Sequence, residues 1–403
     1  MNILYINHYA GSPEMGMEFR PYYLAREWVK MGHHVTIIAG DYSHLRRKNP
    51  IIEKDYKNEI IDGIEYVWLK TGEYSGNGVK RALTMERFVR KLMVNAKMIA
   101  KRWNPNVVIA SSTYPLDTYA AQKIARLSNA KYIHEVHDMW PSTLYEVGGM
   151  SQKHPFVVLM QIAENSAYKH CDKCVSLLPY AKDYMVDHGL ASDKFVNIQN
   201  GIVEEEWKES QAIPEEHRTF FEQHSEQFVV GYFGGHALSN ALDRGLDVAK
   251  NFLGKNVIFV FVGDGVEKAR LIQRAKDETI NNAYFLPSVP KKAIPNLVSC
   301  FDCSFMTGMI SPLYRFGLCL NKMYDSMMAA VPIVCAFDAP DTLVKTYNCG
   351  YQCGASEEET VAAIKKMIAL PSEERKRLGQ NGRRAVLEHY TYEKLAKQFE
   401  ELF

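Results

Sequence analysis

Residues 257–265 read VIFVFVGDG, an unbroken apolar run that ends in a turn with two glycines. A run of β-branched and aromatic residues of this length is typical of a parallel strand buried on both faces of a sheet. The glycines predict a sharp turn into a helix, which we place at 266–276. This strand–turn–helix unit recurs along the chain and indicates an α/β protein with helices covering parallel sheets.

Apolar runs of strand length fall into two series, separated by a polar, charged stretch near 204–226. The first series comprises 2–6, 34–39, 66–69, 107–110, 132–136 and 174–178. The second series comprises 228–233, 257–262, 284–286, 303–306 and 332–335. Helical patterns lie between the strands, for example at 18–31, which ends at Gly32. Two such series predict two doubly wound domains, at 1–204 and 205–389, followed by a C-terminal helix within 390–403.

The composition excludes several classes of protein. The chain of 403 residues carries a formal net charge of +1 and is 47% hydrophobic and 24% charged. That balance is ordinary for a globular protein, and it gives a nucleic-acid partner no electrostatic advantage. The first residues read directly into a strand, and no apolar run approaches the ~18 residues that span a bilayer. We therefore expect a cytoplasmic or peripheral protein with no signal peptide, no transmembrane helix and no nucleic-acid partner.

Loops that follow strands are the candidate sites, because ligands of doubly wound sheets bind at the carboxyl ends of strands. The first such loop, 8–16, reads HYAGSPEMG, and Gly16 stands where a helix N-terminus would meet an anion. The loop lacks the G-x-G-x-x-G pattern that a dinucleotide-dependent dehydrogenase carries here, which disfavours that class. The alternative is that Gly16 only forms a turn.

A second loop, 134–141, reads HEVHDMWP and places four titratable side chains at a strand end. His137 can donate a hydrogen bond to a sugar, and Asp138 can orient it. The alternative is a structural histidine. A third loop contains Gly235, followed by Arg244 at the start of a helix. Glycine lets a backbone approach a phosphate, and arginine offers paired donors to it. The alternative is a tight turn with a solvated arginine.

The most informative stretch is 316–332, FGLCLNKMYDSMMAAVP, which leads through a glycine-containing loop into a helix. Lys322 and Asp325 are three residues apart and share one face of that helix. A lysine at a helix N-terminus can hold a pyrophosphate, and a carboxylate one turn later can accept hydrogen bonds from ribose hydroxyls. The alternative is a surface ion pair worth under ~1 kcal/mol.

Taken in order, several segments resemble the GT-B glycosyltransferases of retaining family 4. The likeness covers nearly the whole chain and is closest to bacterial enzymes of O-antigen and capsule assembly, including the N-acetyl-L-fucosamine transferase branch. The segments that carry it are GHHV at 32–35, EVHDMWP at 135–141, IQNGI at 198–202, GYFGG at 231–235, FVGDG at 261–265, FLPSVPKKAIPNLV at 285–298 and NKMYDSMMAAVPIV at 321–334.

The resemblance implies two Rossmann-like domains that face each other across a cleft, with the acceptor bound by 1–204 and the nucleotide-sugar by 205–389. It also implies that the last helix packs back toward the first domain. The implied catalytic residues are His137, Arg244 and Lys322. The implied donor-binding residues are Gly16, Gly235, Arg244, Val289, Asn321, Lys322 and Asp325, with Val289 at the base and Asp325 at the ribose.

Three positions depart from the family pattern. Gly317 stands where the first acid of an E-x7-E motif binds hydroxyls of the donor sugar. Its presence disfavours a plain hexose and is compatible with a deoxy or acetamido sugar. Asp325 replaces the second glutamate of that motif and is one methylene shorter. His236 lies near the position of a basic residue that usually follows GYFGG.

The implied activity is retaining transfer of a sugar from a nucleotide-sugar, with no metal or cofactor expected and with UDP as the expected nucleotide. The expected acceptor is a polyprenyl-diphosphate-linked or saccharide acceptor of cell-surface polysaccharide synthesis. Residues 77–103 carry eight basic groups and one acid, with apolar residues at helical spacing. Such a helix can lie on an anionic membrane, which would place the protein at the cytoplasmic face of the inner membrane. The alternative is a solvated helix that packs on the first domain.

Two rival functions remain open from the residues. A sugar-nucleotide 2-epimerase of GT-B-like architecture would keep the nucleotide site but need no lipid acceptor, and the basic segment 77–103 disfavours it. A non-catalytic nucleotide-sugar-binding relative is suggested by Gly317. The presence of His137, Arg244, Lys322 and Asp325 speaks against that second rival.

Overall fold

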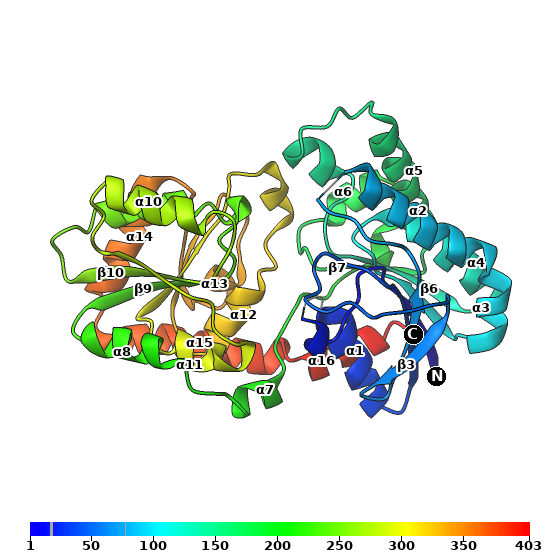
Figure 1. Cartoon of the computed structure of the whole chain (residues 1–403), viewed down its shortest axis with the longest axis horizontal. Coiled ribbons are helices and arrows are strands. Elements are labelled where there is room, and N and C mark those ends of the chain that lie inside the picture. The colour runs from blue at the N-terminus through cyan, green and yellow to red at the C-terminus, as the bar shows by residue number, and fades with distance from the viewer. Residues whose placement is uncertain (17–18, 77) are drawn as a thin grey trace. The chain divides into compact units, whose positions relative to one another are not determined.

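The computed structural model of the chain describes residues 1–16, 19–76 and 78–403. They form two compact α/β units (Figure 1). Unit 1 comprises Met1–Gln199 and Tyr392–Phe403, and unit 2 comprises Asn200–Thr391. The first boundary therefore precedes the predicted 204. The reason is that Ile202 is buried in the core of unit 2, forms a parallel bridge with Thr391 and donates its N–H to the carbonyl of Tyr390 at 2.9 Å.

The sheet of unit 1, in the described residues, has the strand order β3-β4-β2-β1-β5-β6-β7-β8. All neighbouring strands are parallel except β3 and β4, which are antiparallel. The order reverses between β1 and β5, so the loops that follow these two strands lie at the switch point where such sheets bind ligands. The strands are β1 (Asn2–Ile6), β2 (His34–Gly40), β3 (Lys57–Ile61), β4 (Ile64–Leu69), β5 (Val107–Ala110), β6 (Lys131–Val136), β7 (Lys173–Ser176) and β8 (Phe195–Asn197).

The sheet of unit 2 has the order β11-β10-β9-β12-β13-β14 in the described residues, with every neighbouring pair parallel. Its order reverses between β9 and β12. The strands are β9 (Phe228–Phe233), β10 (Val257–Val262), β11 (Ala283–Leu286), β12 (Cys303–Thr307), β13 (Ile333–Ala336) and β14 (Gly350–Cys353). All six residues of β10 are buried, as expected for a strand covered on both faces.

Helices cover both faces of each sheet, and Figure 1 shows α10 and α14 on one face of the unit 2 sheet with α8, α11 and α15 on the other. The helices of unit 1 are α1 (Phe19–Lys30), α2 (Val79–Val94), α3 (Ala96–Trp103), α4 (Thr118–Ser128), α5 (Pro155–His170), α6 (Lys182–Asp187) and α16 (Tyr392–Glu400). Those of unit 2 are α7 (Glu204–Lys208), α8 (Glu215–Gln223), α9 (Leu242–Lys250), α10 (Lys268–Asp277), α11 (Ile294–Val298), α12 (Asn321–Met328), α13 (Leu343–Thr346), α14 (Glu357–Ala369) and α15 (Ser372–His389).

The helix α16 is part of unit 1, although it comes last in the chain. Its Phe399 is fully buried and packs edge-on against the buried ring of Trp28, with the ring centres 5.3 Å apart. The indole N–H of Trp28 donates to the carbonyl of Ala396 at 3.0 Å. The segment Tyr392–Phe403 therefore completes the core beside α1.

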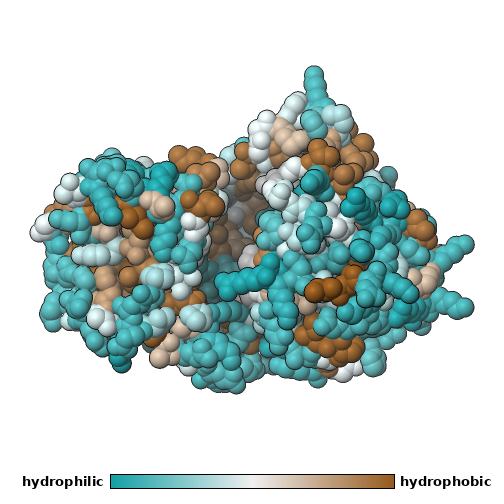
Figure 2. All heavy atoms as spheres, viewed as in Figure 1, coloured by the Kyte–Doolittle hydropathy of each residue, from teal (hydrophilic) through white to brown (hydrophobic). Residues whose placement is uncertain are grey.

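The predicted basic helix at 77–103 is interrupted. It consists of α2 and α3, which meet at Asn95, and residue 77 lies outside the described part. The apolar face of the pair is turned into unit 1, where Met85, Phe88 and Ile99 are buried. The apolar residues that recur at helical spacing in this segment therefore pack inside unit 1. In the described residues, no helix is long and apolar enough to cross a membrane. Figure 2 shows hydrophilic side chains over most of the visible face, with separate hydrophobic patches on both units.

Candidate functional site

The loop after β9 brings a lysine of α12 against a glycine turn. Gly234 has φ 134°, a conformation that favours glycine. The Nζ atom of Lys322 donates to the hydroxyl of Tyr232 and to Oδ1 of Asn240, each at 3.1 Å. The carbonyl of Gly235 in turn accepts from the Tyr232 hydroxyl at 2.8 Å and from Nδ2 of Asn240 at 2.9 Å. Lys322 and Gly235, which the sequence predicts for the donor site, are thus joined through two shared partners.

The ammonium of Lys322 is held by neutral groups. In the described part of the chain it has no acidic partner, so the alternative of a surface ion pair with Asp325 is wrong. Burial lowers the pKa of Lys322 to about 8. The side chain also stands at the first turn of α12, where unpaired backbone N–H groups favour an anion. A partly dehydrated cation at a helix N-terminus is suited to bind a phosphate group.

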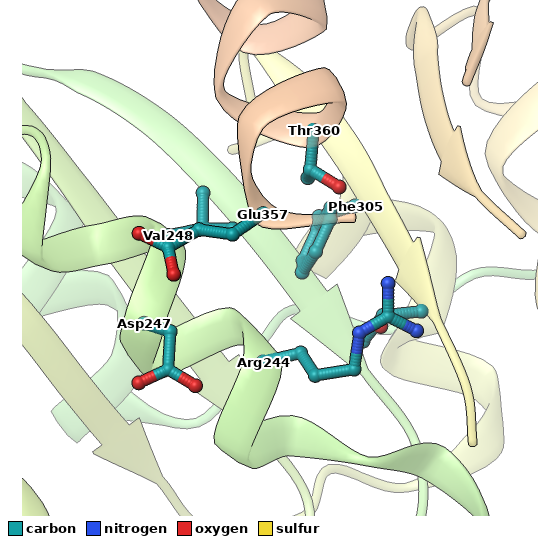
Figure 3. Close-up of a pocket in the computed structure, with 7 residues that line it drawn as sticks. Arg244, Asp247, Val248, Phe305, Glu357 and Thr360 are labelled. Carbon is teal, nitrogen blue, oxygen red and sulfur yellow. The ribbon is translucent and has the colours of Figure 1, made fainter. Parts of the chain in front are cut away.

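Arg244 lies in the first turn of α9 and points toward the end of β12 (Figure 3). Its Nη1 atom donates to the carbonyl of Gly308 at 2.7 Å. Burial lowers the pKa of Arg244, although it stays far above neutrality. The side chain borders a cavity of about 80 Å³ that is lined by Arg244, Asp247, Val248, Phe305, Thr307, Glu357 and Thr360. Because Met309 donates its N–H to the carbonyl of Ser239 at 3.0 Å, the loops after β9 and β12 touch at the switch point of this sheet.

Asp325 lies one turn after Lys322 in α12 and is partly buried. Burial raises the pKa of its carboxyl to about 7, an effect that Lys291 opposes and Glu206 reinforces. No side chain among the described residues donates a hydrogen bond to this carboxyl. Asn321 opens the same helix, is exposed, and accepts a hydrogen bond at Oδ1 from Nδ2 of Asn200 at 2.9 Å.

The predicted base-reading residue, Val289, lies in the loop after β11 and is partly buried. The preceding residue, Ser288, donates its backbone N–H to Oδ2 of Asp264 at 3.2 Å. Hydrogen bonds from Ser288 and Lys268 lower the pKa of Asp264 to about 2. The GDG turn at 263–265 therefore supports the loop that contains Val289.

His236 is fully buried, and neither ring nitrogen has a hydrogen-bond partner. Burial and the nearby Lys268 lower its pKa to about 4, so the ring is neutral. It therefore does not supply the positive charge that the family pattern places near this turn.

Gly317, at the position of the missing acid, has φ 93° and ψ −178°. That region of backbone conformation is open essentially to glycine alone. Its N–H donates to the carbonyl of Tyr314 at 2.9 Å, which closes the turn at the end of the 3₁₀ segment Pro312–Phe316. The loop of this chain is thus built around glycine, and a glutamate here would be strained.

In unit 1, Gly16 ends the 3₁₀ turn Pro13–Met15 with φ 59°. Its N–H donates to the carbonyl of Ser12 at 3.1 Å, so this donor is already used within the loop. A Cβ atom at Gly16 would lie 3.2 Å from Cδ of Arg47. Residues 17 and 18, which lead into α1, lie outside the described residues.

His137 follows β6 and is held by two groups that the sequence analysis did not assign. Its Nε2 atom lies 3.0 Å from Oε2 of Glu135 and 2.9 Å from Oγ of Ser111. Glu135 is fully buried, and Arg20 forms an ion pair with its other oxygen at 2.9 Å. Glu135, not the predicted Asp138, lies within hydrogen-bonding distance of Nε2 of His137. Asp138 follows His137 in the chain, and burial, the larger effect, raises the pKa of its carboxyl while the histidine lowers it.

A signal for Glu135 was present in the sequence. A carboxylate inside the buried strand KYIHEV needs a partner, because burying an unpaired charge is costly. Arg20, Ser111 and Tyr5 could not be named as those partners, because they lie more than 20 residues away in sequence. The groups around His137 thus come from β1, α1, β6 and the loop that follows β5.

Several basic groups of the segment 77–103 are engaged within unit 1. Arg87 donates to the carbonyl of Thr71 at 2.9 Å, and Lys91 pairs with Asp55 at 2.6 Å. Lys80, Lys97 and Lys101 remain exposed.

In the described residues, no group of three or more His, Cys, Asp or Glu side chains is arranged to hold a metal ion.

Two family models match successive parts of the chain. The model described as Glycosyltransferase Family 4 matches residues 15–206, and the model described as Glycosyl transferases group 1 matches residues 215–385. The chain is also similar to WcaI of Escherichia coli (strain K12), whose name describes a colanic acid biosynthesis glycosyl transferase. The two are 21% identical over 215 residues, which is 51% of this chain and 51% of that protein. The match thus spans about half the length of each.

Solved structures share the fold over the full chain. Sucrose-phosphate synthase from Thermosynechococcus elongatus has a TM-score of 0.74 at 15% identity, covering 99% of this chain and 97% of that one. HepE from Anabaena, solved in complex with UDP and glucose, has a TM-score of 0.66 at 15% identity, covering 100% of this chain and 98% of that one. At such identities the likeness shows the fold, which is GT-B, as the sequence predicts.

Proposed function

Because the chain is a glycosyltransferase of the GT-B fold with a Family 4 and a group 1 domain, we propose that it transfers a deoxy or acetamido sugar from a UDP-linked donor with retention of configuration. The acceptor is a polyprenyl-diphosphate-linked or saccharide intermediate of cell-surface polysaccharide synthesis. Unit 2 binds the nucleotide-sugar through Gly235, Arg244, Val289, Asn321, Lys322 and Asp325. Unit 1 binds the acceptor and supplies Gly16 and His137.

The observation that carries this proposal is the environment of Lys322. Its ammonium is partly buried at the first turn of α12, beside Gly234, and only neutral oxygen atoms accept its hydrogen bonds in the described part of unit 2. A dehydrated cation without a carboxylate partner is costly to keep. A diphosphate would supply the missing negative charge.

In the proposed reaction, negative charge grows on the diphosphate as the bond to the sugar breaks. Lys322, Arg244 and the N-terminus of α12 stabilise that charge, so the transfer proceeds without a metal ion. Losing one such donor is expected to slow the reaction on the order of 10²–10³-fold. Asp325 accepts hydrogen bonds from the ribose, and His137 contacts the donor sugar.

The choice of UDP and of the pathway rests on relatives. HepE was solved with UDP and glucose, and the name of WcaI describes colanic acid biosynthesis. Gly317 supports a deoxy or acetamido sugar, because the loop built around it has no carboxylate to bind an additional hydroxyl. A lipid-linked acceptor fits peripheral membrane contact at the cytoplasmic face through the exposed Lys80, Lys97 and Lys101.

The first test is titration calorimetry of the full chain with UDP, GDP, CDP and their common sugars, in the presence of EDTA. We expect one nucleotide to bind and Lys322→Ala and Arg244→Ala to weaken it at least tenfold. Lys345→Ala is the matched control, because Lys345 lies in the same unit but pairs with Asp341 in an exposed position. If none of these nucleotides binds, the proposed donor site in unit 2 is wrong.

Transfer is then measured with the nucleotide-sugar that binds and with polyprenyl-diphosphate-linked saccharides as acceptors. The anomeric configuration of the product, read by NMR, tests retention. Tight nucleotide binding without transfer to any acceptor would instead support the non-catalytic alternative. Loss of transfer in EDTA, restored by a divalent ion, would contradict the metal-independent mechanism.

A further inference from the structure

Glu135 is a fully buried carboxylate near the end of β6 that receives hydrogen bonds on both oxygens. Its Oε1 atom accepts from Nε of Arg20 at 3.0 Å. Its Oε2 atom accepts from the hydroxyl of Tyr5 at 2.5 Å and from Oγ of Ser111 at 2.6 Å. The donors come from three different elements of unit 1, so the carboxylate is fixed in place by the fold.

These bonds determine where the hydrogen of the His137 ring must lie. Ser111 has one hydroxyl hydrogen, and it is directed at Glu135. Toward Nε2 of His137, both Oγ of Ser111, at 2.9 Å, and Oε2 of Glu135, at 3.0 Å, therefore present lone pairs. An unprotonated Nε2 would face two acceptors and be repelled, so Nε2 must carry a hydrogen.

We propose that Glu135 is a positioning residue that keeps a hydrogen on Nε2 of His137 and thereby fixes the orientation of the ring. If the proposed transferase function is correct, His137 meets the sugar or acceptor with its ring held in this orientation. The inference about the ring hydrogen stands on unit 1 alone, whereas its effect on transfer rests on the proposed function.

Arg20 keeps the carboxylate ionised for this role. Burial raises the pKa of Glu135, but the Arg20 guanidinium and the hydrogen bonds from His137 and Ser111 outweigh it and hold that pKa well below its usual range. The same guanidinium donates to the carbonyls of Ile198 and Gln199, at 2.9 and 2.7 Å. Arg20 thus ties Glu135 to the chain immediately before Asn200, where unit 2 begins.

The test is NMR of the full chain with ¹⁵N-labelled histidine at pH 8, using long-range correlations that distinguish the two tautomers. His137→Gln identifies the signal of the ring. We expect the Nε2–H form in the unaltered protein. A ring with hydrogen on Nδ1 and none on Nε2 would overturn the proposal, and this readout requires no substrate.

Glu135→Gln gives the second arm. The amide oxygen must face Arg20, which only donates, so the amide NH₂ faces Tyr5, Ser111 and His137. We therefore expect His137 to change to the Nδ1–H tautomer, and the transfer rate to fall at least tenfold while nucleotide affinity stays within twofold. An unchanged tautomer in this variant would refute the positioning role.

Tyr5→Phe is the matched control. It removes one donor to the same oxygen of Glu135 but leaves the charge and the contact with His137 in place, so the tautomer should not change. The neighbouring His134, also buried in β6, serves as an internal reference for intact folding. If Glu135→Gln fails to fold, the position of the ring hydrogen of His137 in the unaltered protein and in Tyr5→Phe still tests the proposal. Absence of transfer in every variant, with the expected tautomers, would count against the proposed function alone.

Discussion

The Nζ atom of Lys322 lies 3.1 Å from the hydroxyl oxygen of Tyr232 and 4.4 Å from the centre of its ring. The hydroxyl hydrogen is directed at the carbonyl of Gly235, so the oxygen is free to accept from the lysine. The ring face adds a cation–π attraction of about 0.5–2 kcal/mol. Tyr232 thus compensates in part for the dehydration of the cation without neutralising it.

The first prediction concerns the pH dependence of nucleotide binding. The pKa of Lys322 is lowered from 10.5 to about 8 by burial, so the ammonium is lost as pH rises through 8. If only the charged form binds the diphosphate, affinity should fall about tenfold between pH 7 and pH 9. Lys322→Arg keeps its charge over that range, and its affinity should be nearly independent of pH. Calorimetry at both pH values measures this, and parallel losses in the two proteins would point to another titrating group.

The second prediction concerns Asp325→Asn. Burial raises the folded-state pKa of Asp325 from 3.8 to about 7, so the folded protein binds more protons than the unfolded chain between these values. Stability from this group is therefore present at low pH and is lost as pH rises toward 7. The full shift corresponds to about 4 kcal/mol, and because Asp325 is only partly buried we expect the variant to be about 1–2 kcal/mol more stable at pH 8 and unchanged near pH 4, while binding the nucleotide more weakly. Thermal unfolding at the two pH values tests the first part.

A third prediction follows from the backbone at Gly317. With φ 93° and ψ −178°, the position excludes a side chain without strain, so Gly317→Ala should destabilise unit 2 by about 1–3 kcal/mol. Gly78→Ala is the control, because a Cβ atom there meets nothing within 4 Å and its φ is −92°. Its effect should stay below about 1 kcal/mol. Equal destabilisation of both variants in urea would contradict the argument.

The fourth prediction concerns Phe399 in α16. Its ring is fully buried against Trp28, so Phe399→Ala should cost about 3–5 kcal/mol of the stability of unit 1. Lys397→Ala on the same helix removes an exposed ion pair with Glu393 and should change stability by under about 1 kcal/mol. Urea denaturation followed by tryptophan fluorescence measures both. A small effect of Phe399→Ala would mean that α16 contributes little to the core.

Much of the sheet structure is readable from the sequence because its strands are buried on both faces. The strands at 107–110, 228–233 and 257–262 match the structure at both ends. The antiparallel edge strand β3 was missed because four of its five residues are exposed, which removes the apolar run that signals a buried strand. The strand β8 was missed because it has only three residues.

In the candidate site, too, some residues could be singled out from the sequence and others could not. Lys322 could be singled out because a lysine in an otherwise apolar helix start needs an explanation. Its partners Tyr232 and Asn240 could not be named, because they come from another strand and loop about 80–90 residues away. The carboxyl partner of His137 was assigned to Asp138 by proximity in sequence. His137 follows the last residue of β6, however, and its ring lies against Glu135, the penultimate residue of that strand, instead.

The placement of α16 has a consequence for the order in which the chain can fold during its synthesis. Trp28 precedes its partner Ala396 by 368 residues, and Phe399 comes later still. The indole of Trp28 therefore lacks its final cover while the whole of Asn200–Thr391 is being made. The core of unit 1 beside α1 is therefore completed only after translation has passed Phe399.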